Sequence, residues 1–126
     1  MANKKDLDFT YTTIDKLFRL SVGETGDYSG AKYDGDFSLS LEQAQKAKHV
    51  FIADSLKITA GSKVLDMACG WGPFSRFIVE ERKAESIGLT LSEGQAAACR
   101  MNGLNVIVKD CRYVSPADFG TFDAIT

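Results

Sequence analysis

The stretch with the clearest chemical meaning runs over residues 63–72, where an apolar run ends in Asp66 and is followed by Gly70 and Gly72. Pro73 then opens a segment whose apolar residues have helical spacing. This order predicts a strand, a tight turn and a helix N-terminus. Glycine lets a ligand approach the backbone closely, and the free N–H groups of a helix start favour an anionic or carboxylate-bearing ligand. Asp66 would accept hydrogen bonds from an ammonium or hydroxyl group of that ligand.

Two other interpretations of this turn stay open. Such turns also join strands to helices in α/β proteins that bind nothing there. A nicotinamide-binding turn fits less well, because it would need Gly or Ala where Ser75 stands and an acid about twenty residues on, at the end of the next strand. That next strand ends at Thr90, Leu91 and Ser92, none of which is acidic.

Strands and helices alternate through the second half of the chain. The pattern predicts strands at 63–67, 86–90, 105–109 and after 120, helices at 73–82 and 93–102, and an irregular stretch at 110–120. Capping boxes at 40–43 and 92–95 would open helices, and Gly103 would end the second of these. Such alternation means a parallel sheet, and a strand after 120 would start the other half of a doubly wound sheet.

The first forty residues predict different structure. Residues 9–20 carry Tyr11, Ile14, Leu17 and Phe18 at helical spacing, which indicates a short amphipathic helix. Residues 21–37 hold four glycines together with Tyr28, Tyr33 and Phe37, which indicates an ordered loop. The helix after it would place on one face Leu41, Ala44, Ala47 and Phe51.

Composition narrows the function classes. The 126 residues make one globular domain at most, and a net charge of −2 gives no electrostatic case for nucleic acid. No apolar run approaches the roughly 20 residues needed to span a bilayer, and the N-terminus lacks the apolar stretch of a signal peptide. The three cysteines form no C-x-x-C pair, which indicates neither a disulfide frame nor a zinc site. A cytoplasmic protein with reduced thiols is expected. His49, the only histidine, is placed at an exposed or interfacial helix position without a catalytic role.

Several separated motifs together resemble the cyclopropane-fatty-acyl-phospholipid synthase family, which includes the mycolic acid cyclopropane synthases. They occur in family order from about residue 10 to 126, and are Asp27-Tyr28-Ser29-Gly30-Ala31, Ser40-Leu41-Glu42-Gln43-Ala44, Cys69-Gly70-Trp71-Gly72, Gly88-Leu89-Thr90-Leu91-Ser92-x-x-Gln95 and Asp110-Cys111-Arg112. The resemblance implies a Rossmann-like class I methyltransferase fold of α/β class that binds S-adenosylmethionine (SAM). It also implies transfer of a methyl or methylene group to a lipid or other small acceptor.

The resemblance also assigns cofactor-binding residues. In chain order it places Tyr28 and Ser29 over the methionine moiety, Asp66, Cys69, Gly70 and Gly72 against the amino-acid part, Thr90, Leu91 and Gln95 at the ribose, and Asp110 and Cys111 at the adenine. Some of these have a structural alternative, since Thr90 and Gln95 could serve a helix cap and Asp110 a turn. Residues 1–60 would form a helical lid, and residues 61–126 a SAM-binding domain cut near its fourth strand.

Two positions depart from the family pattern. Ala68 replaces the first glycine of the turn, which is tolerable if its φ is negative. Gly30 replaces a cysteine that helps cyclopropane synthases bind bicarbonate, and the remaining family catalytic groups would lie beyond Thr126. We therefore expect no appreciable turnover from this chain alone, no identifiable catalytic residue within it, and self-association through the incomplete sheet. A SAM-binding regulatory half-domain without turnover remains the alternative, and peripheral membrane contact would accompany a lipid acceptor.

Overall fold

A four-stranded parallel sheet forms the centre of the computed structural model, which describes residues 3, 5–7, 9–10, 13–14, 17 and 26–126. The strands are β1 (Lys63–Met67), β2 (Glu85–Thr90), β3 (Val106–Val108) and β4 (Ala124–Ile125), in the order β3-β2-β1-β4. Val64 of β1 pairs with Ser86 on one side and Ala124 on the other. The strand order therefore reverses between β1 and β4, which confirms the predicted doubly wound arrangement.

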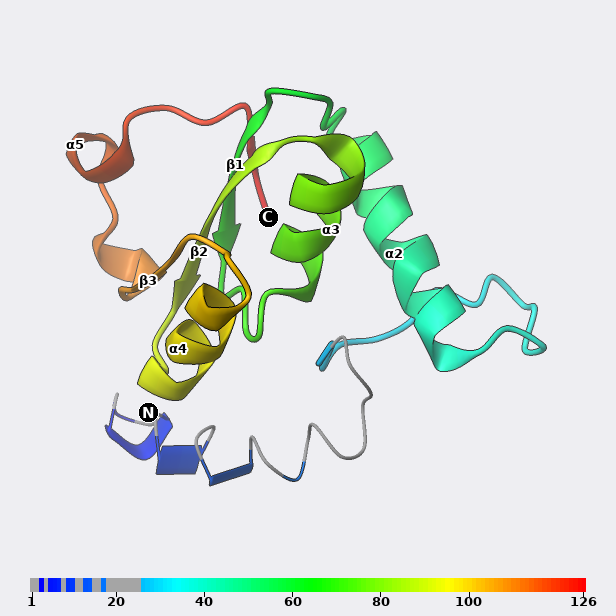
Figure 1. Ribbon diagram of the computed structural model, residues 1–126, viewed down its shortest axis with the longest axis horizontal. Helices are drawn as coiled ribbons and strands as arrows, with labels where there is room; N and C mark the ends of the chain where they lie inside the picture. Colours follow the sequence, from blue (N-terminus) through cyan, green and yellow to red (C-terminus); the bar gives the residue numbers. More distant parts are fainter. Residues whose placement is uncertain (1–2, 4, 8, 11–12, 15–16, 18–25) are drawn as a thin grey trace.

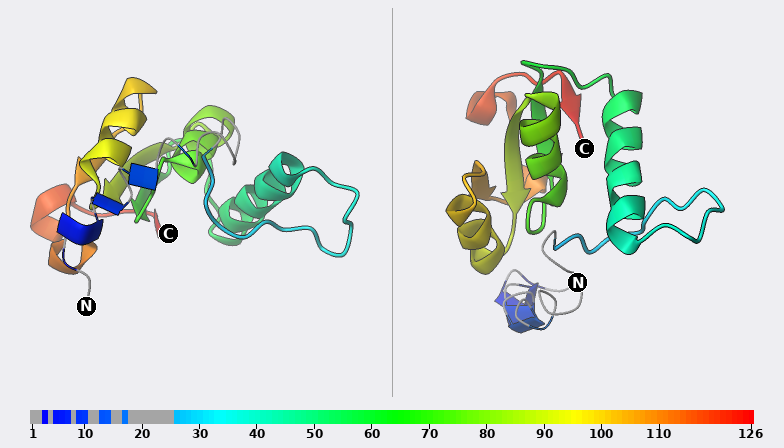
Figure 2. Two further views of the ribbon diagram at one scale, coloured as in Figure 1. Left: turned by 90° about the horizontal axis from the view of Figure 1, so that it is seen from below. Right: turned by 45° about the vertical axis from the view of Figure 1, so that its right-hand side comes forward.

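Helices cover this sheet from one end to the other (Figure 1). They are α2 (Leu41–Ser55), α3 (Pro73–Arg82), α4 (Glu93–Met101) and α5 (Pro116–Phe119), with a short 3-10 helix at Cys111–Tyr113. In both views of Figure 2, α3 lies between α4 and α2. The stretch 110–120, predicted to be irregular, thus contains two short helical segments.

Local signals explain where the long helices begin and end. The capping box of α2 is complete, since Ser40 Oγ accepts from the Gln43 N–H and Gln43 Oε1 accepts from the Ser40 N–H. Helix α4 ends at Met101 and is followed by Gly103 with φ 75°, and the Leu104 N–H donates to the Cys99 carbonyl as a Schellman motif requires. The predicted bounds of α3 and α4 are confirmed to within one residue, whereas α2 ends at Ser55, before the stretch 58–62 that was expected to end it.

The predicted apolar face of α2 is confirmed at Ala44 and wrong at its two large residues. Leu41 and Phe51 are 40% and 56% exposed, whereas the buried positions are Ala44, Gln45, His49 and Ala53. The buried stripe is partly polar because one end of α2 packs against the loop that begins at residue 26. His49 was expected at an exposed or interfacial position and is instead buried. An apolar-spacing argument could not identify this face.

Two apolar clusters hold the layers together. One joins α2, α3, β1 and β4, and contains Ala53, Ile58, Val64, Phe74, Phe77, Ile78, Ala84 and Ala124. The other joins α4 to the turn after β1 and to β3, and contains Cys69, Ala96, Cys99, Leu104 and Val106. Within the described residues, no helix is long and apolar enough to cross a membrane.

The N-terminal predictions are only partly covered. Ile14 and Leu17 have helical backbone, as predicted, but Tyr11 and Phe18 lie outside the described residues. The predicted loop over 21–37 is described from residue 26 onward, and from there to residue 40 it contains neither helix nor strand. Its aromatic rings are ordered, since Tyr33 and Phe37 stack with their centroids 5.7 Å apart.

Candidate functional site

A cavity of about 500 Å³ opens at the carboxyl ends of the strands. Its wall includes Asp66 at the end of β1, Thr90 at the end of β2, Lys109 after β3 and Thr126 after β4. This is the place where ligands bind in doubly wound sheets, beside the point at which the strand order reverses. Ten of the predicted site residues line it: Tyr28, Ser29, Asp66, Cys69, Gly70, Thr90, Leu91, Gln95, Asp110 and Cys111.

Gly72 is the predicted site residue that does not line this cavity. It caps the N-terminus of α3 with φ 77°, and a Cβ there would lie 2.6 Å from Leu104 Cδ1 and 3.1 Å from Cys99 Sγ. The residue is glycine because α4 packs against it and because its backbone is left-handed. The structure therefore gives Gly72 a packing role.

The turn after β1 has an unusual backbone. Ala68 has φ 69°, so the expectation of a negative φ at this position is wrong. Left-handed geometry at a residue with a Cβ costs about 1–2 kcal/mol, and the turn holds it because the Cys69 N–H is bound by the Leu89 carbonyl. Gly70 has φ 57°, and no atom lies within 4 Å of the place a Cβ would take, so its surface is open toward the cavity.

Asp66 is a buried carboxylate at the base of this turn, 7% exposed. Its Oδ2 accepts from Ser75 Oγ at 2.8 Å, and Ser75 Oγ in turn accepts from Ser86 Oγ at 2.9 Å. Burial raises the pKa of Asp66, and the hydrogen bonds from Ser75 and Thr126 offset only part of that rise. A cation bound in the cavity would therefore gain from contact with this carboxylate, which has no positively charged partner bonded to it among the described residues.

The thiols beside the turn are structural. Cys69 and Cys99 both donate to the Gly70 carbonyl, at 3.8 and 3.6 Å. The hydrogen bond with Cys99, burial and the nearby Asp66 charge all raise the pKa of the Cys69 thiol. The thiol therefore stays protonated, and Cys69 presents an uncharged wall to the cavity. The described residues contain no group of three His, Cys, Asp or Glu that could hold a metal ion.

The end of β2 and the start of α4 form a polar pair. Thr90 Oγ1 donates to Gln95 Oε1 at 2.6 Å and accepts from the Ser92 N–H at 3.1 Å. The Gln95 N–H binds Ser92 Oγ, but the Gln95 side chain does not return to Ser92, so the predicted second capping box is only half formed. The Ser92 N–H instead donates to Thr90 Oγ1, and the Gln95 side chain lies buried at the cavity wall.

Asp110 and Cys111 form the far wall. Asp110 caps the short helix at Cys111–Tyr113 by accepting from the Arg112 N–H at 2.9 Å. Its carboxylate also binds the Arg112 guanidinium at 2.6 Å, which lowers the pKa of Asp110. Asp110 is therefore both a cavity residue and a turn residue, the two alternatives that the sequence left open.

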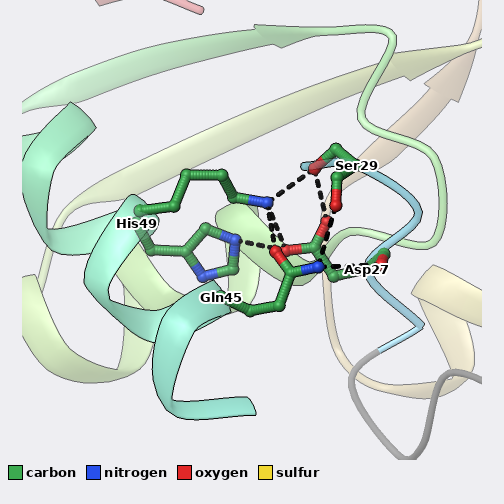
Figure 3. Close-up of polar contacts among 5 residues, drawn as sticks. Asp27, Ser29, Gln45 and His49 are labelled. Atoms are coloured by element: carbon green, nitrogen blue, oxygen red, sulfur yellow. Dashed lines mark hydrogen bonds and ion pairs between the residues drawn. The ribbon is translucent and has the colours of Figure 1, made fainter. Parts of the chain in front are cut away.

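A buried polar cluster closes the opposite wall (Figure 3). The Asp27 carboxylate, 5% exposed, accepts from Ser29 Oγ at 2.7 Å, Lys48 Nζ at 2.6 Å and His49 Nε2 at 2.9 Å. Gln45 Nε2 donates to the Ser29 carbonyl at 2.9 Å. Burial alone would raise the pKa of Asp27, but the hydrogen bonds from His49, Lys48 and Ser29 outweigh it and lower the pKa to about 2.

Asp27, Lys48 and His49 line the cavity and were not predicted to do so. The available signal was the spacing of Gln45, Lys48 and His49, which places three polar side chains on one face of α2. Only the packing of the 26–30 loop on that face makes it buried. Trp71, Phe74 and Ile52 add an apolar side to the cavity.

Comparison with known proteins shows the family to which the chain belongs. The family model described as mycolic acid cyclopropane synthetase matches residues 1–125. The chain belongs to that family.

Curated relatives of the family match most of the chain. Hydroxymycolate synthase MmaA4 of Mycobacterium tuberculosis is 39% identical over 95 residues, which are 75% of this chain and 31% of that protein. Cyclopropane mycolic acid synthase 3 of the same species is 38% identical over 86 residues, which are 68% of this chain and 30% of that protein. The chain thus spans about a third of the length of these relatives.

A solved structure of the family has the same fold. Mycolic acid cyclopropane synthase CmaA1, complexed with SAH and CTAB, superposes with a TM-score of 0.82 at 27% identity, covering 90% of this chain and 42% of that chain. The cyclopropane synthase MmaA2 from Mycobacterium tuberculosis gives a TM-score of 0.76 at 30% identity, covering 84% of this chain and 40% of that chain. The Rossmann-like class I methyltransferase fold is therefore confirmed for the part present.

Proposed function

We propose that this chain is the SAM-binding portion of a cyclopropane-synthase-like methyltransferase, and that SAM occupies the cavity at the carboxyl ends of the strands. The observation that carries the proposal is the convergence of ten predicted cofactor residues, from four separate parts of the chain, on one cavity. A relative with the same fold is complexed with SAH, the product that SAM leaves. SAM supplies a sulfonium-bound methyl group when bound.

The residues present suit the parts of this ligand. Asp66 offers a buried carboxylate to the ammonium of the methionine moiety, and the open backbone at Gly70 admits that moiety. Gln95 Oε1 is already occupied by Thr90, so the Nε2 amide of Gln95 is the donor that we assign to a ribose hydroxyl. Leu91 lines the cavity beside the proposed ribose position, and Asp110 and Cys111 line the wall that we assign to the adenine.

We assign the acceptor to a lipid or another small molecule. The apolar side of the cavity, formed by Ile52, Trp71 and Phe74, supports an acceptor with a hydrocarbon part. An apolar lining also favours methyl transfer from a sulfonium, because the positive charge on sulfur disappears in the transition state. We also propose that residues 1–60 form a lid and that residues 61–126 form the SAM-binding domain. We further propose a cytoplasmic location, peripheral contact with a membrane, and self-association of the chain.

Calorimetry with SAM, SAH and NAD tests the ligand assignment. We expect SAM and SAH to bind and NAD to give no heat. Gly70→Val should abolish SAM binding, because the valine side chain would project into the cavity. Gly61→Val is the matched control, since Gly61 also has a positive φ, also has nothing within 4 Å of a Cβ, and does not line the cavity. Equal SAM affinity of the two variants would contradict the assignment.

A further inference from the structure

His49 is the one histidine of the sequence, and the residues around it fix its imidazole ring in place. Its Nε2 atom lies 2.9 Å from Asp27 Oδ2, and its ring is packed between Phe74 and Phe77 at centroid distances of 5.7 and 5.6 Å (Figure 3). The ring is therefore fixed both in position and in rotation. A carboxylate on one ring nitrogen sets which nitrogen carries the proton, and leaves the other available to accept one.

The available nitrogen is Nδ1. No described residue makes a hydrogen bond to it, while every fully buried side-chain nitrogen or oxygen atom in the described part of the chain has a partner. Nδ1 is therefore not fully buried, and His49 is one of the residues that line the cavity. The imidazole is thus held by one nitrogen and accessible at the other.

Lys48 shares the carboxylate that binds His49. Its ammonium lies 2.6 Å from Asp27 Oδ2, so the carboxylate has a positively charged partner. Asp27 therefore bonds to both side chains and holds the imidazole in place beside the ammonium.

The position of His49 in the cavity is on the amino-acid side. A positive charge on His49 would lower the pKa of Asp66, which shows that the two side chains are close enough to interact electrostatically. Ser29 donates to the same Asp27 carboxylate, and both Ser29 and its neighbour Tyr28 line the cavity. Asp110 and Cys111 are on the wall that we assign to the adenine. The imidazole therefore lies on the side where the sulfur and its methyl group would be.

We infer that His49, oriented by Asp27, is the catalytic base that takes the proton lost by the methyl acceptor. This inference rests on the proposed function. The acceptor forms a bond to the methyl carbon while the carbon–sulfur bond breaks, and the electron pair of that bond stays on sulfur. An alkene acceptor becomes a carbocation in this step. A proton then leaves a carbon next to the cationic centre, such as the added methyl group, for His49 Nδ1 and from there for water, and the electron pair of that C–H bond neutralises the cation. Asp27 acts as a positioning residue, and Gly30 adds no side chain beside it.

The placement of His49 is tested by NMR, without turnover. Because the chain has one histidine, its ring protons give one identifiable set of signals, which His49→Gln removes. We expect saturating SAM and saturating SAH to shift these signals by different amounts, because only SAM carries a methyl group and a positive charge on sulfur. Signals that stay unchanged while calorimetry shows saturation would overturn the inference and leave the proposed function intact. Absence of SAM binding would overturn both.

The role of His49 is tested by single-turnover transfer of radiolabelled methyl from SAM to vesicles of mono-unsaturated phosphatidylglycerol, with protein in excess. These conditions detect a transfer that is too slow to give appreciable multiple turnover. We expect His49→Gln to lower the rate at least about 100-fold, the usual contribution of a general base. SAM affinity should stay within about threefold of the wild type. Asp27→Asn should lower the rate less, since the imidazole remains.

Lys46→Gln is the matched control for these variants. Lys46 is on the same helix, pairs with Glu81 at the surface and does not line the cavity. Its rate should equal that of the wild type. A His49→Gln chain that binds SAM and transfers methyl as fast as the wild type would overturn the base assignment. So would a wild-type chain that binds SAM but labels no lipid.

Discussion

Replacing Asp27 by asparagine should destabilise the protein, because the buried carboxylate accepts hydrogen bonds from His49, Lys48 and Ser29. Its pKa falls from 3.8 to about 2 on folding, so the charged form is favoured in the folded state. That difference corresponds to about 2–3 kcal/mol, at roughly 1.4 kcal/mol per pH unit. For a chain of this size, a loss of that order lowers Tm by roughly 10 °C.

The pH dependence of this loss follows from the direction of the shift. A carboxyl group with a depressed folded-state pKa contributes stability above its unfolded value of 3.8, and this contribution is lost as the pH falls toward 2. The difference between wild type and Asp27→Asn should therefore be present at pH 7 and shrink below pH 4. Urea unfolding followed by circular dichroism at a series of pH values measures it.

Asp54→Asn is the control for this prediction. Asp54 is also on α2 and binds Arg82 at 2.7 Å, but its side chain is 59% exposed. Exposed ion pairs contribute about 0–1 kcal/mol, so this variant should stay close to the wild type. If Asp27→Asn were no less stable than Asp54→Asn at pH 7, or if its deficit did not change between pH 7 and pH 3, the account of the cluster would be refuted.

Three further predictions concern the turn and the loop. Ala68→Gly should raise the free energy of unfolding by about 1 kcal/mol, since glycine adopts φ 69° without steric cost; unchanged urea midpoints would contradict it. Asp66→Asn should raise Tm of the free protein at pH 7, because burial raises the pKa of Asp66 and its ionisation therefore opposes folding as the pH rises past 3.8. The same variant should abolish SAM binding, because it removes the carboxylate assigned to the ammonium of SAM. A lower Tm by calorimetry would disprove the first of these. Hydrogen exchange across 26–37 should slow when SAM is added, and equal protection with and without saturating SAM would argue against a closing lid.

Much of the fold follows from local sequence signals. The strand at 63–67, the helix at 73–82 and the capping box at 40–43 depend on residues a few positions apart, and the structure has them where they were predicted. The order of the strands also follows, because alternating strands and helices allow few arrangements of a parallel sheet. The site at the carboxyl ends of those strands is a consequence of that order.

Tertiary packing decided the rest, because the decisive contacts join residues far apart in the chain. Asp27 meets Lys48 across 21 positions, and nothing in the sequence around His49 shows that a loop will cover it. The same holds for position 72, which requires glycine because Leu104, a residue that follows α4 in the chain, would lie too close to a Cβ. At Ala68, the hydrogen bond from Cys69 to β2 holds a left-handed backbone that an alanine would not adopt by itself. Sequence patterns report on neighbours, whereas burial and backbone strain depend on what folds against them.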